Sequence, residues 1–398
     1  MKPSCDLLHT KILYVDWNCY GGQDMKSALH RAGATLSLYP FSPRTDRTDA
    51  AFEIDFTNAI RSFSPQYVFS FNYFPIISKV CNMLETTYVS WVYDSPLVAL
   101  YSYTLANPCN RVFLFDKQEY LFFKNNGIPT VDYLPLAAAP GRLPSDAASP
   151  NAVQKYRADI SFVGSLYTEP KHQLHHRIRN LPDFTRGYLD GIMQAQKQIY
   201  GASLIEELLN EDVLSELRKA CPCPPHQDGV ETERYLYSNY FLLRQVTAME
   251  RTELIQKISR QYALQLYTND KTFTCPGCTN HGPADYYQEA PYIFFHSKIN
   301  LNITLRSIKS GIPLRAFDIM GSRGFLLTNY QDDFLDCFIP DEDYVYYTNT
   351  EDLLSKIEYY LSHEKERLEI CRNGYEKILS HHTYDCRIPV LFGDLSGK

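Results

Sequence analysis

Two polar residues follow apolar runs that are typical of buried strands in the first part of the chain. Asp94 follows the run 88–92, and Asn72 follows the run 67–71. A carboxylate at the end of a strand could take the proton of an attacking hydroxyl group as a general base. The Asn72 amide is a weaker candidate for holding that same group by a hydrogen bond. A purely structural role for Asp94, as the cap of the segment that follows it, stays open.

A second set of charged residues lies in the stretch 297–320. Arg315 precedes Asp318 by three positions, so the two side chains share one face of the helix expected there. A guanidinium at this position could bind a diphosphate through two parallel hydrogen bonds. Lys298 is a further candidate for binding phosphate, with a solvated surface lysine as the alternative. Asp318 has its own structural alternative, as a cap or a partner on its helix.

Two glycine turns come after strand-like runs, and the first of them does so directly. Gly164 and Ser165 follow the run 159–163, and Gly21 and Gly22 follow the first strand of the chain. Glycines at such turns let backbone N–H groups approach a phosphate or another anion. An ordinary tight turn explains either pair equally well.

The 11 cysteines show no spacing typical of a disulfide scaffold, which favours a reducing compartment. Cys275 and Cys278 have the spacing of half a zinc site. Cys221 and Cys223, or His281, would have to complete it, and the sequence leaves open whether these cysteines bind a metal.

Alternating strand and helix patterns predict two α/β domains. We expect the first over residues 1–140, a linker rich in Ala, Pro, Gly and Ser at 141–155, and the second over 156–380. Residues 292–295 are among the expected strands of the second domain, and Thr350 is the expected cap of its last helix. A helical insertion should occupy about 188–260, and residues 381–398 should form a C-terminal tail.

Composition excludes several classes of function. The net charge is -7 and no block of Lys or Arg stands out, so nucleic acid is not an expected partner. No run approaches the roughly 18 apolar residues that a transmembrane segment needs. We therefore expect a cytoplasmic protein. The pattern Gly-x-Gly-x-x-Gly follows the first strand of neither domain, which argues against a nicotinamide-dependent oxidoreductase.

The stretch 281–329, with the segments 297–302 and 310–320, resembles the C-terminal half of the CgeB-type (spore maturation protein B-like) group 1 glycosyltransferases. The runs 69–75, 89–96 and 133–138 are similar to the N-terminal domain that accompanies it. The resemblance implies the GT-B fold, an α/β architecture in which two Rossmann-like domains face each other across a cleft. It covers most of the chain and is weakest in the helical insertion.

The resemblance also implies roles for individual residues. Asp318 would hold the ribose hydroxyls of a nucleotide-sugar, and the acceptor would lie near Gly21, Gly22 and Asn72, with Asp94 as the base. The remaining expected donor-binding residues are Gly164, Ser165, Lys298, Asn300, Ser310 and Arg315. Retaining relatives carry two Glu eight positions apart, whereas Ser310 and Asp318 stand at these positions here. This departure leaves open whether the reaction retains or inverts the anomeric centre.

The function implied is a Leloir-type hexosyltransferase. It would move a sugar from a UDP-, GDP- or dTDP-linked donor to a glycan, a protein or a cell-surface or spore polymer. No particular cofactor is expected, and the sequence leaves open whether a divalent ion assists. The alternative is a non-catalytic nucleotide-sugar or glycan-binding protein that keeps the GT-B fold, since Ser310 replaces an acidic residue.

Overall fold

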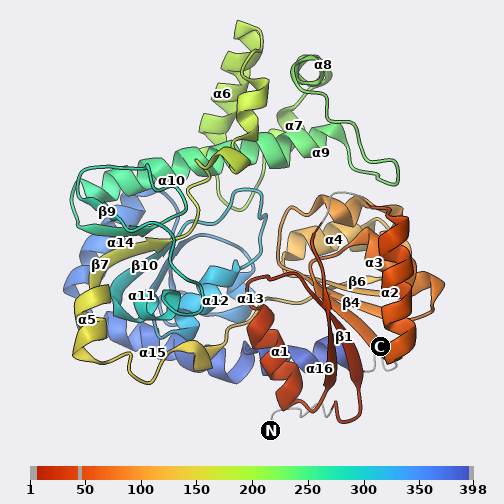
Figure 1. Cartoon of the computed structure of the whole chain (residues 1–398). Helices are drawn as coiled ribbons and strands as arrows, with labels where there is room; N and C mark the ends of the chain where they lie inside the picture. The colour runs from red at the N-terminus through yellow and green to blue at the C-terminus, as the bar shows by residue number, and fades with distance from the viewer. Residues whose placement is uncertain (1–6, 44–46, 394–398) are drawn as a thin grey trace. The chain divides into compact units, whose positions relative to one another are not determined.

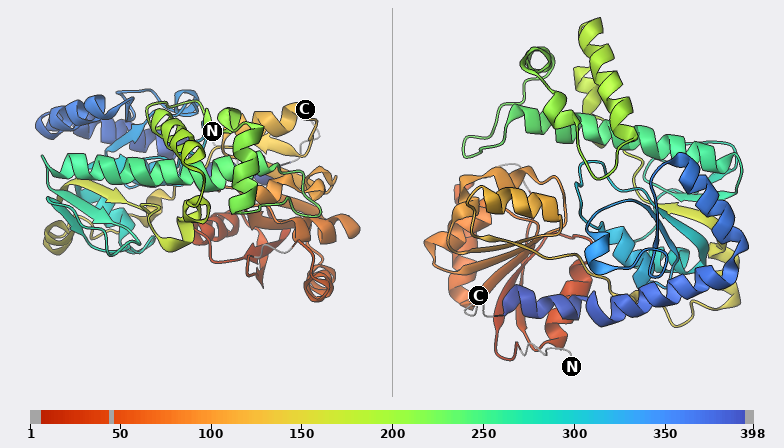
Figure 2. Two further views of the ribbon diagram at one scale, coloured as in Figure 1. Left: turned by 90° about the horizontal axis from the view of Figure 1, so that it is seen from above. Right: turned by 180° about the vertical axis from the view of Figure 1, so that it is seen from behind.

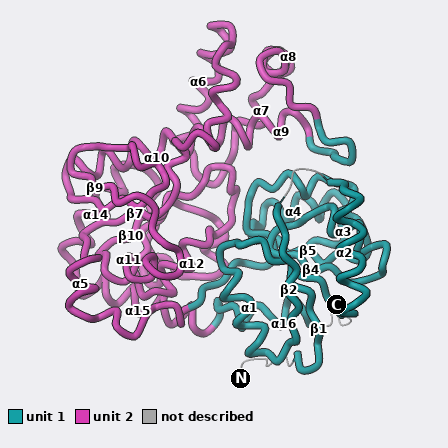
Figure 3. Tube along the Cα trace, viewed as in Figure 1, with its two compact units in different colours: residues 1–139, 225–231, 381–398 teal, residues 140–224, 232–380 magenta. Residues whose placement is uncertain are grey.

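The computed structural model describes residues 7–43 and 47–393, which fold into two compact units (Figure 3). Unit 1 comprises residues 1–139, 225–231 and 381–398, and unit 2 comprises residues 140–224 and 232–380. Each unit is built around its own six-stranded sheet. Within the described ranges, every helix is too short or too polar to cross a lipid bilayer.

The sheet of unit 1 is formed by β1 (Lys11–Asp16), β2 (Thr35–Pro40), β3 (Tyr67–Phe71), β4 (Thr87–Val92), β5 (Asn110–Leu114) and β6 (Val131–Tyr133). These strands are parallel and lie in the order β2-β1-β3-β4-β5-β6. Figure 1 labels β1, β4 and β6 of this sheet. The inner strands β3 and β4 are mostly apolar and buried, as strands covered by helices on both faces must be. The order reverses between β1 and β3, and open α/β sheets bind ligands at the carboxyl ends of such strands.

The helices that connect these strands are α1 (Gly22–Arg31), α2 (Ala50–Phe63), α3 (Pro75–Met83) and α4 (Lys117–Asn125). Helices α2 and α4 each begin at an aspartate that caps them. The Asp49 side chain accepts the backbone N–H groups of Ala51 and Phe52 at the start of α2, and Asp116 caps α4 in the same way. The crossover helices thereby begin just past the strand ends and leave the carboxyl edge of the sheet lined by loops.

Two segments that are distant in sequence complete unit 1. The expected tail contains α16 (Tyr384–Phe392) instead. Its Arg387 donates hydrogen bonds to the carbonyl oxygens of Pro135 and Leu136 at 2.8 and 2.9 Å, and the Tyr384 ring packs against Trp91. These buried contacts explain why the segment is folded. They involve residues far apart in the sequence, so local sequence patterns do not predict them.

The segment 225–231, which interrupts the helical insertion, also belongs to unit 1. The buried Arg47 guanidinium donates to Asp228 at 2.8 Å and to Glu231 at 3.3 Å. Ser102 donates a further hydrogen bond to Asp228 at 2.6 Å. Because one buried guanidinium binds two carboxylates of this segment, these contacts fix the position of the segment within unit 1.

The sheet of unit 2 is formed by β7 (Ala158–Val163), β8 (Leu264–Tyr267), β9 (Cys278–Asn280), β10 (Ser297–Asn302), β11 (Leu326–Asn329) and β12 (Val345–Tyr347). All its pairs are parallel, in the order β12-β11-β10-β7-β8-β9. The order reverses between β7 and β10. Residues 164–165 and 303–304, which follow these strands, therefore lie at the expected ligand-binding edge.

The helices of unit 2 are α5 (Pro150–Tyr156), α6 (Asp183–Lys197), α7 (Ile205–Leu208), α8 (Glu211–Ala220), α9 (Glu233–Leu236), α10 (Leu243–Ser259), α11 (Ala290–His296), α12 (Leu314–Gly321), α13 (Phe334–Cys337), α14 (Thr350–Ser362) and α15 (Glu364–His381). A π-helical turn at Tyr237–Leu242 joins α9 to α10. Helices α6, α7 and α8 lie on the side of α10 that faces away from the sheet (Figure 2).

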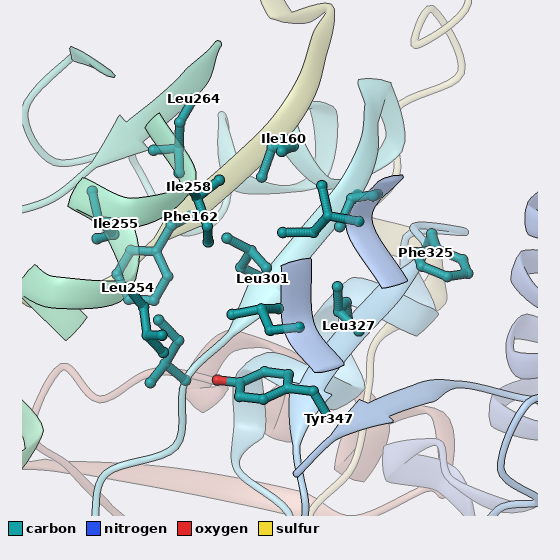
Figure 4. Packing of buried hydrophobic residues seen from close by; sticks show 14 of the residues in the cluster. Ile160, Phe162, Leu254, Ile255, Ile258, Leu264, Leu301, Phe325, Leu327 and Tyr347 are labelled. Carbon is teal, nitrogen blue, oxygen red and sulfur yellow. The ribbon is translucent and has the colours of Figure 1, made fainter. Parts of the chain in front are cut away.

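The helices of the insertion have an apolar core of their own, whereas the second half of α10 packs on the sheet. Leu254, Ile255 and Ile258 of α10 join the cluster that contains Phe162 and Leu301 (Figure 4). The insertion core includes Ile178, Leu189, Ile192, Leu214, Leu217, Phe241 and Val246. Thus α10 serves both as the end of the insertion and as the crossover helix between β7 and β8.

Two local expectations for unit 2 are wrong. Residues 292–295 lie in α11, because Pro291 starts a helix and Ile293 and Phe294 are buried on one side of it. The cap of α14 is Asn349, whose side chain accepts the N–H of Asp352, and Thr350 is the first residue of the helix.

Candidate functional site

Gly164, Arg315 and Asp318 lie together at the carboxyl edge of the unit 2 sheet. Gly164 directly follows β7, has a φ of +149°, and donates its N–H to the carbonyl oxygen of Tyr267 at 2.8 Å. Arg315, in the first turn of α12, reaches back over Gly164 and lies 5.6 Å from the centre of the Phe162 ring. Glycine suits position 164 because residues with a side chain rarely adopt a φ of +149°, and a Cβ there would also meet the Arg315 guanidinium.

Replacing Gly164 by alanine should therefore displace Arg315. We expect this variant to bind a nucleoside diphosphate about tenfold more weakly, because a charged hydrogen bond is lost. Its melting temperature should fall as well, because a residue with a side chain rarely adopts a φ of +149°. Calorimetric titration with UDP measures the first effect. Gly187→Ala, where the new methyl group meets nothing within 4 Å, is the matched control, and equal UDP affinities for the two variants would contradict the expectation.

Asp318 is buried in α12 and is held by two donors. Its carboxylate accepts a hydrogen bond from Arg142 Nη2 at 2.6 Å and another from the Tyr286 hydroxyl at 3.2 Å. Burial raises the pKa of Asp318, while the positive charges of Arg142 and Arg315 oppose that rise. The side chain is thus a buried hydrogen-bond acceptor beside Arg315, and not a helix cap.

Arg251 of α10 is a buried cation at this edge that the sequence analysis does not single out. Its guanidinium donates to the carbonyl oxygens of Ser165, at 2.6 Å, and of Ile303, and so joins the loops that follow β7 and β10. Within the described residues it forms no ion pair with a carboxylate. Burial lowers the pKa of Arg251, while Tyr167 and the nearby carboxylates of Glu250 and Glu169 oppose that fall. Helix α10 carries several other charged residues, among them Arg244, Glu253 and Lys257, so no sequence signal distinguishes Arg251 from them.

Two buried polar atoms at the same edge have no hydrogen-bond partner among the described residues. They are Asn302 Oδ1, at the end of β10, and Thr268 Oγ1, just past β8. The Asn302 amide nitrogen donates to Thr328 at 2.9 Å and to Thr304 at 3.1 Å, so the side chain is held in one orientation. Both atoms are enclosed by the protein, so they do not by themselves indicate a contact with a ligand.

The other expected donor-binding residues are placed differently. Lys298 pairs with Asp159 at 2.7 Å in the first half of β10, and both side chains are partly exposed. Asn300 is buried in the middle of the strand, where it accepts from Ser161 at 3.0 Å. The Ser165 hydroxyl donates to Glu169 at 2.6 Å. Lys298 therefore lies near the amino end of its strand, whereas Gly164 lies at the carboxyl ends of the strands. It does not contact the expected donor site.

Ser310 is buried in the loop that joins β10 to α12. Its carbonyl oxygen accepts the backbone N–H of Asp333 at 3.1 Å. The residue thus lies on the ligand-binding side of the sheet, and its backbone fixes the loop that precedes Arg315.

In unit 1, Asn72 and Asp94 lie side by side at the carboxyl ends of β3 and β4. Asn72 is buried, has a φ of 57°, and donates its amide N–H to Asp94 Oδ2 at 2.7 Å. Its side-chain oxygen accepts the backbone N–H groups of Tyr93 and Asp94 at 3.1 and 3.2 Å. Asn72 therefore fixes the orientation of an exposed carboxylate.

Aromatic rings surround this pair, and the sequence analysis does not include them. Trp17, in the loop after β1, stacks on Tyr93 with ring centres 6.1 Å apart and an interplanar angle of 17°. Phe74 meets Trp17 edge to face. Burial and then the Asp94 carboxylate raise the pKa of Tyr93, so its hydroxyl stays protonated. In the sequence, Trp17 could have been noticed only because a large aromatic residue is unusual in the loop that follows a first strand.

Gly21 and Gly22 lie at the start of α1 in the same unit. Gly21 has a φ of 74°, and a Cβ there would overlap the Tyr384 hydroxyl group. The Gly22 carbonyl oxygen accepts a hydrogen bond from Tyr14 at 3.3 Å. This turn is therefore closed by the protein's own tyrosines.

The cysteines do not assemble a metal site within the described ranges, where no three His, Cys, Asp or Glu side chains are grouped to hold an ion. Cys275 and Cys278 instead lie at a turn, with the Cys275 thiol 3.4 Å from the Ser259 hydroxyl. Burial raises the pKa of Cys278 to about 12, which keeps that thiol protonated.

Comparisons with known proteins agree with this architecture. Residues 244–392, which include Arg251, Arg315 and Asp318, match the family described as glycosyl transferase-like. A glycosyltransferase from Rickettsia africae aligns over 98% of this chain and 99% of its own, with a TM-score of 0.52 and 9% identity. No curated protein sequence gives a significant match.

Two further solved structures are similar over nearly their whole lengths. Sucrose-phosphate synthase from Thermosynechococcus elongatus aligns over 95% of this chain and 96% of its own, with a TM-score of 0.51 and 11% identity. HepE from Anabaena, in complex with UDP and glucose, aligns over 96% and 99%, with a TM-score of 0.51 and 10% identity. This chain therefore has the two-domain α/β fold of the GT-B glycosyltransferases, and its residues 244–392 form a glycosyl transferase-like segment.

Proposed function

We propose that this protein is a nucleotide-sugar-dependent glycosyltransferase of the CgeB-type subgroup. The proposal is supported chiefly by the group of residues at the carboxyl edge of the unit 2 sheet. There, the glycine turn at 164 meets the guanidinium of Arg315, the buried cation Arg251 and the buried carboxylate of Asp318. Cations beside a glycine turn suit a diphosphate, and a buried carboxylate suits a pair of hydroxyl groups.

In this proposal unit 2 binds the donor. The diphosphate lies over Gly164 and is held by Arg315, with Arg251 adding positive potential from below the two loops. Asp318 accepts hydrogen bonds from the ribose hydroxyls. UDP is the first donor nucleotide to test, because the similar HepE structure contains UDP and glucose. Lys298 and Asn300 are left out of the donor site because of their contacts within β10.

Unit 1 supplies the acceptor side and the base. The acceptor hydroxyl oxygen attacks C1 of the donor sugar, its proton passes to the Asp94 carboxylate, and the nucleoside diphosphate leaves with the bonding electron pair. Arg315 stabilises the charge that develops on the leaving diphosphate. Asn72 is a positioning residue, since its amide holds Asp94 Oδ2 at 2.7 Å. With a carboxylate acting as a base, we propose inversion at the anomeric centre.

Replacing Asp318 by alanine tests the donor site. We expect the affinity for UDP-glucose to fall by about 1–3 kcal/mol, the scale of losing charged hydrogen bonds. Calorimetric titration measures this, and Asp159→Ala is the matched control because Asp159 is an exposed carboxylate near the other edge of the same sheet. Unchanged affinity in the Asp318 variant would refute the ribose role.

Incubating the wild-type protein with UDP-glucose separates the enzyme from a binding module. Release of UDP, even by slow hydrolysis without acceptor, supports a transferase. Tight binding with no release over hours, with and without oligosaccharide acceptors, would favour the non-catalytic alternative.

A further inference from the structure

Arg142, Tyr286 and Tyr287 form a compact group next to Asp318 that the proposed donor contacts do not use. Arg142 Nη2 donates to Asp318 Oδ1 at 2.6 Å and to the Tyr286 hydroxyl at 2.9 Å. Its guanidinium lies 4.4 Å from the centre of the Tyr286 ring and 5.6 Å from that of Tyr287. The two tyrosine rings meet edge to face, with their centres 4.8 Å apart. We refer to these three residues as the Arg142 cluster.

The elements that carry the Arg142 cluster are separate from those of the diphosphate site. Arg142 ends a short 3-10 turn at Pro140–Arg142, and the two tyrosines lie in the loop before α11. Arg315, in contrast, extends from the first turn of α12 to Gly164 after β7. Asp318 is the residue that connects the two groups, because it bonds to Arg142 and Tyr286 while Arg315 acts on its charge.

The covalent order of a nucleotide then suggests what the Arg142 cluster binds. The base is attached at C1′ of the ribose and the diphosphate at C5′, on opposite sides of the hydroxyl groups. If the hydroxyls lie at Asp318 and the diphosphate at Gly164 and Arg315, the base must extend to the other side of Asp318. We infer that the Arg142 cluster is the nucleobase subsite of the donor, an inference that rests on the proposed function of Asp318.

The chemistry of the cluster limits which base fits. A planar guanidinium and tyrosine rings offer flat faces on which a base can stack. Guanidinium nitrogens only donate hydrogen bonds. They therefore match bases that present carbonyl oxygens, which uracil, thymine, guanine and cytosine do and adenine does not. The subsite selects a carbonyl-bearing base, represented by UDP, over adenine.

The test compares the binding of UDP, ADP and inorganic pyrophosphate by calorimetry. Wild-type protein should bind UDP at least tenfold more tightly than ADP. Tyr287→Leu keeps an apolar side chain but removes the flat ring. It should weaken UDP binding about tenfold, the scale of one base–aromatic stack, and leave pyrophosphate binding unchanged. Tyr292→Leu, which alters a tyrosine of α11 that hydrogen-bonds to Asp146, is the matched control and should leave UDP binding unchanged.

A second variant probes selectivity without removing the charge next to Asp318. Arg142→Lys keeps an ammonium partner for the buried carboxylate but loses the planar fork, so the preference for UDP over ADP should shrink to less than threefold. The inference is overturned if Tyr287→Leu weakens UDP and pyrophosphate equally, if it leaves UDP binding unchanged, or if ADP binds as tightly as UDP to the wild type. Failure of the wild type to bind any nucleotide would instead refute the proposed donor site itself.

Discussion

Replacing Asp94 by asparagine is expected to lower the rate of sugar transfer about 10²–10⁴-fold, the usual contribution of a general base. The asparagine amide keeps the size of the carboxylate but cannot take the acceptor proton. Asn72, whose amide donates to Asp94 Oδ2 at 2.7 Å, keeps its two backbone hydrogen bonds in the variant, so the fold should persist. UDP release in the presence of acceptor measures the effect.

The interpretation of this loss depends on two controls. UDP affinity should be unchanged in Asp94→Asn, because the donor residues belong to unit 2. Asp132→Asn, at a half-exposed carboxylate in β6 of the same unit, should transfer sugar at the wild-type rate. A transfer rate within threefold of wild type in Asp94→Asn would place the base elsewhere and leave Asp94 with the capping role.

The largest expected effect on stability comes from Arg306, whose guanidinium binds both oxygens of Glu250 at 2.6 and 2.7 Å. Both side chains are buried, with 6% and 5% exposure. Arg306→Leu leaves the Glu250 carboxylate buried without its cation, which costs about 3–5 kcal/mol of unfolding free energy. Urea titration followed by circular dichroism is the suitable measurement, because both tryptophans, Trp17 and Trp91, belong to unit 1.

Removing both charges distinguishes the cost of leaving a buried charge unpaired from the cost of repacking the side chains around it. The double variant Arg306→Leu/Glu250→Leu should recover most of the lost stability, since no uncompensated charge remains. Arg372→Leu breaks an exposed ion pair with Glu369 at 3.4 Å and should cost less than about 1 kcal/mol. If Arg306→Leu is no more destabilising than Arg372→Leu, the ion pair between Arg306, in the loop after β10, and Glu250, in α10, does not stabilise the fold.

Sequence patterns predict most of the two sheets because strand formation depends on short apolar runs. The runs 67–71 and 88–92 become neighbouring strands, and the two residues that follow them, Asn72 and Asp94, meet at one edge. Parallel strands that are adjacent in sequence must end at the same edge. The proximity of Asn72 and Asp94 can therefore be expected from the two apolar runs and from the geometry of parallel strands.

The prediction fails where burial overrides local preference. The aromatic run at 292–295 favours a strand, yet it forms a helix after Pro291 because its apolar side packs into unit 2. Lys298 is chosen for its charge, but its place in the first half of β10 sets it beside Asp159. Charge alone does not reveal on which edge of a sheet a residue lies.

Residues close together in the chain are enough to predict the α/β class, the strand ends that carry Asn72, Asp94 and Gly164, and the shared helical face of Arg315 and Asp318. The contact between Asp318 and Arg142, 176 residues apart, is visible only in the folded protein. The same holds for Arg251, which joins the loops after β7 and β10. Such contacts arise from the packing of separate elements, whose side chains meet only after the sheet has set their distances.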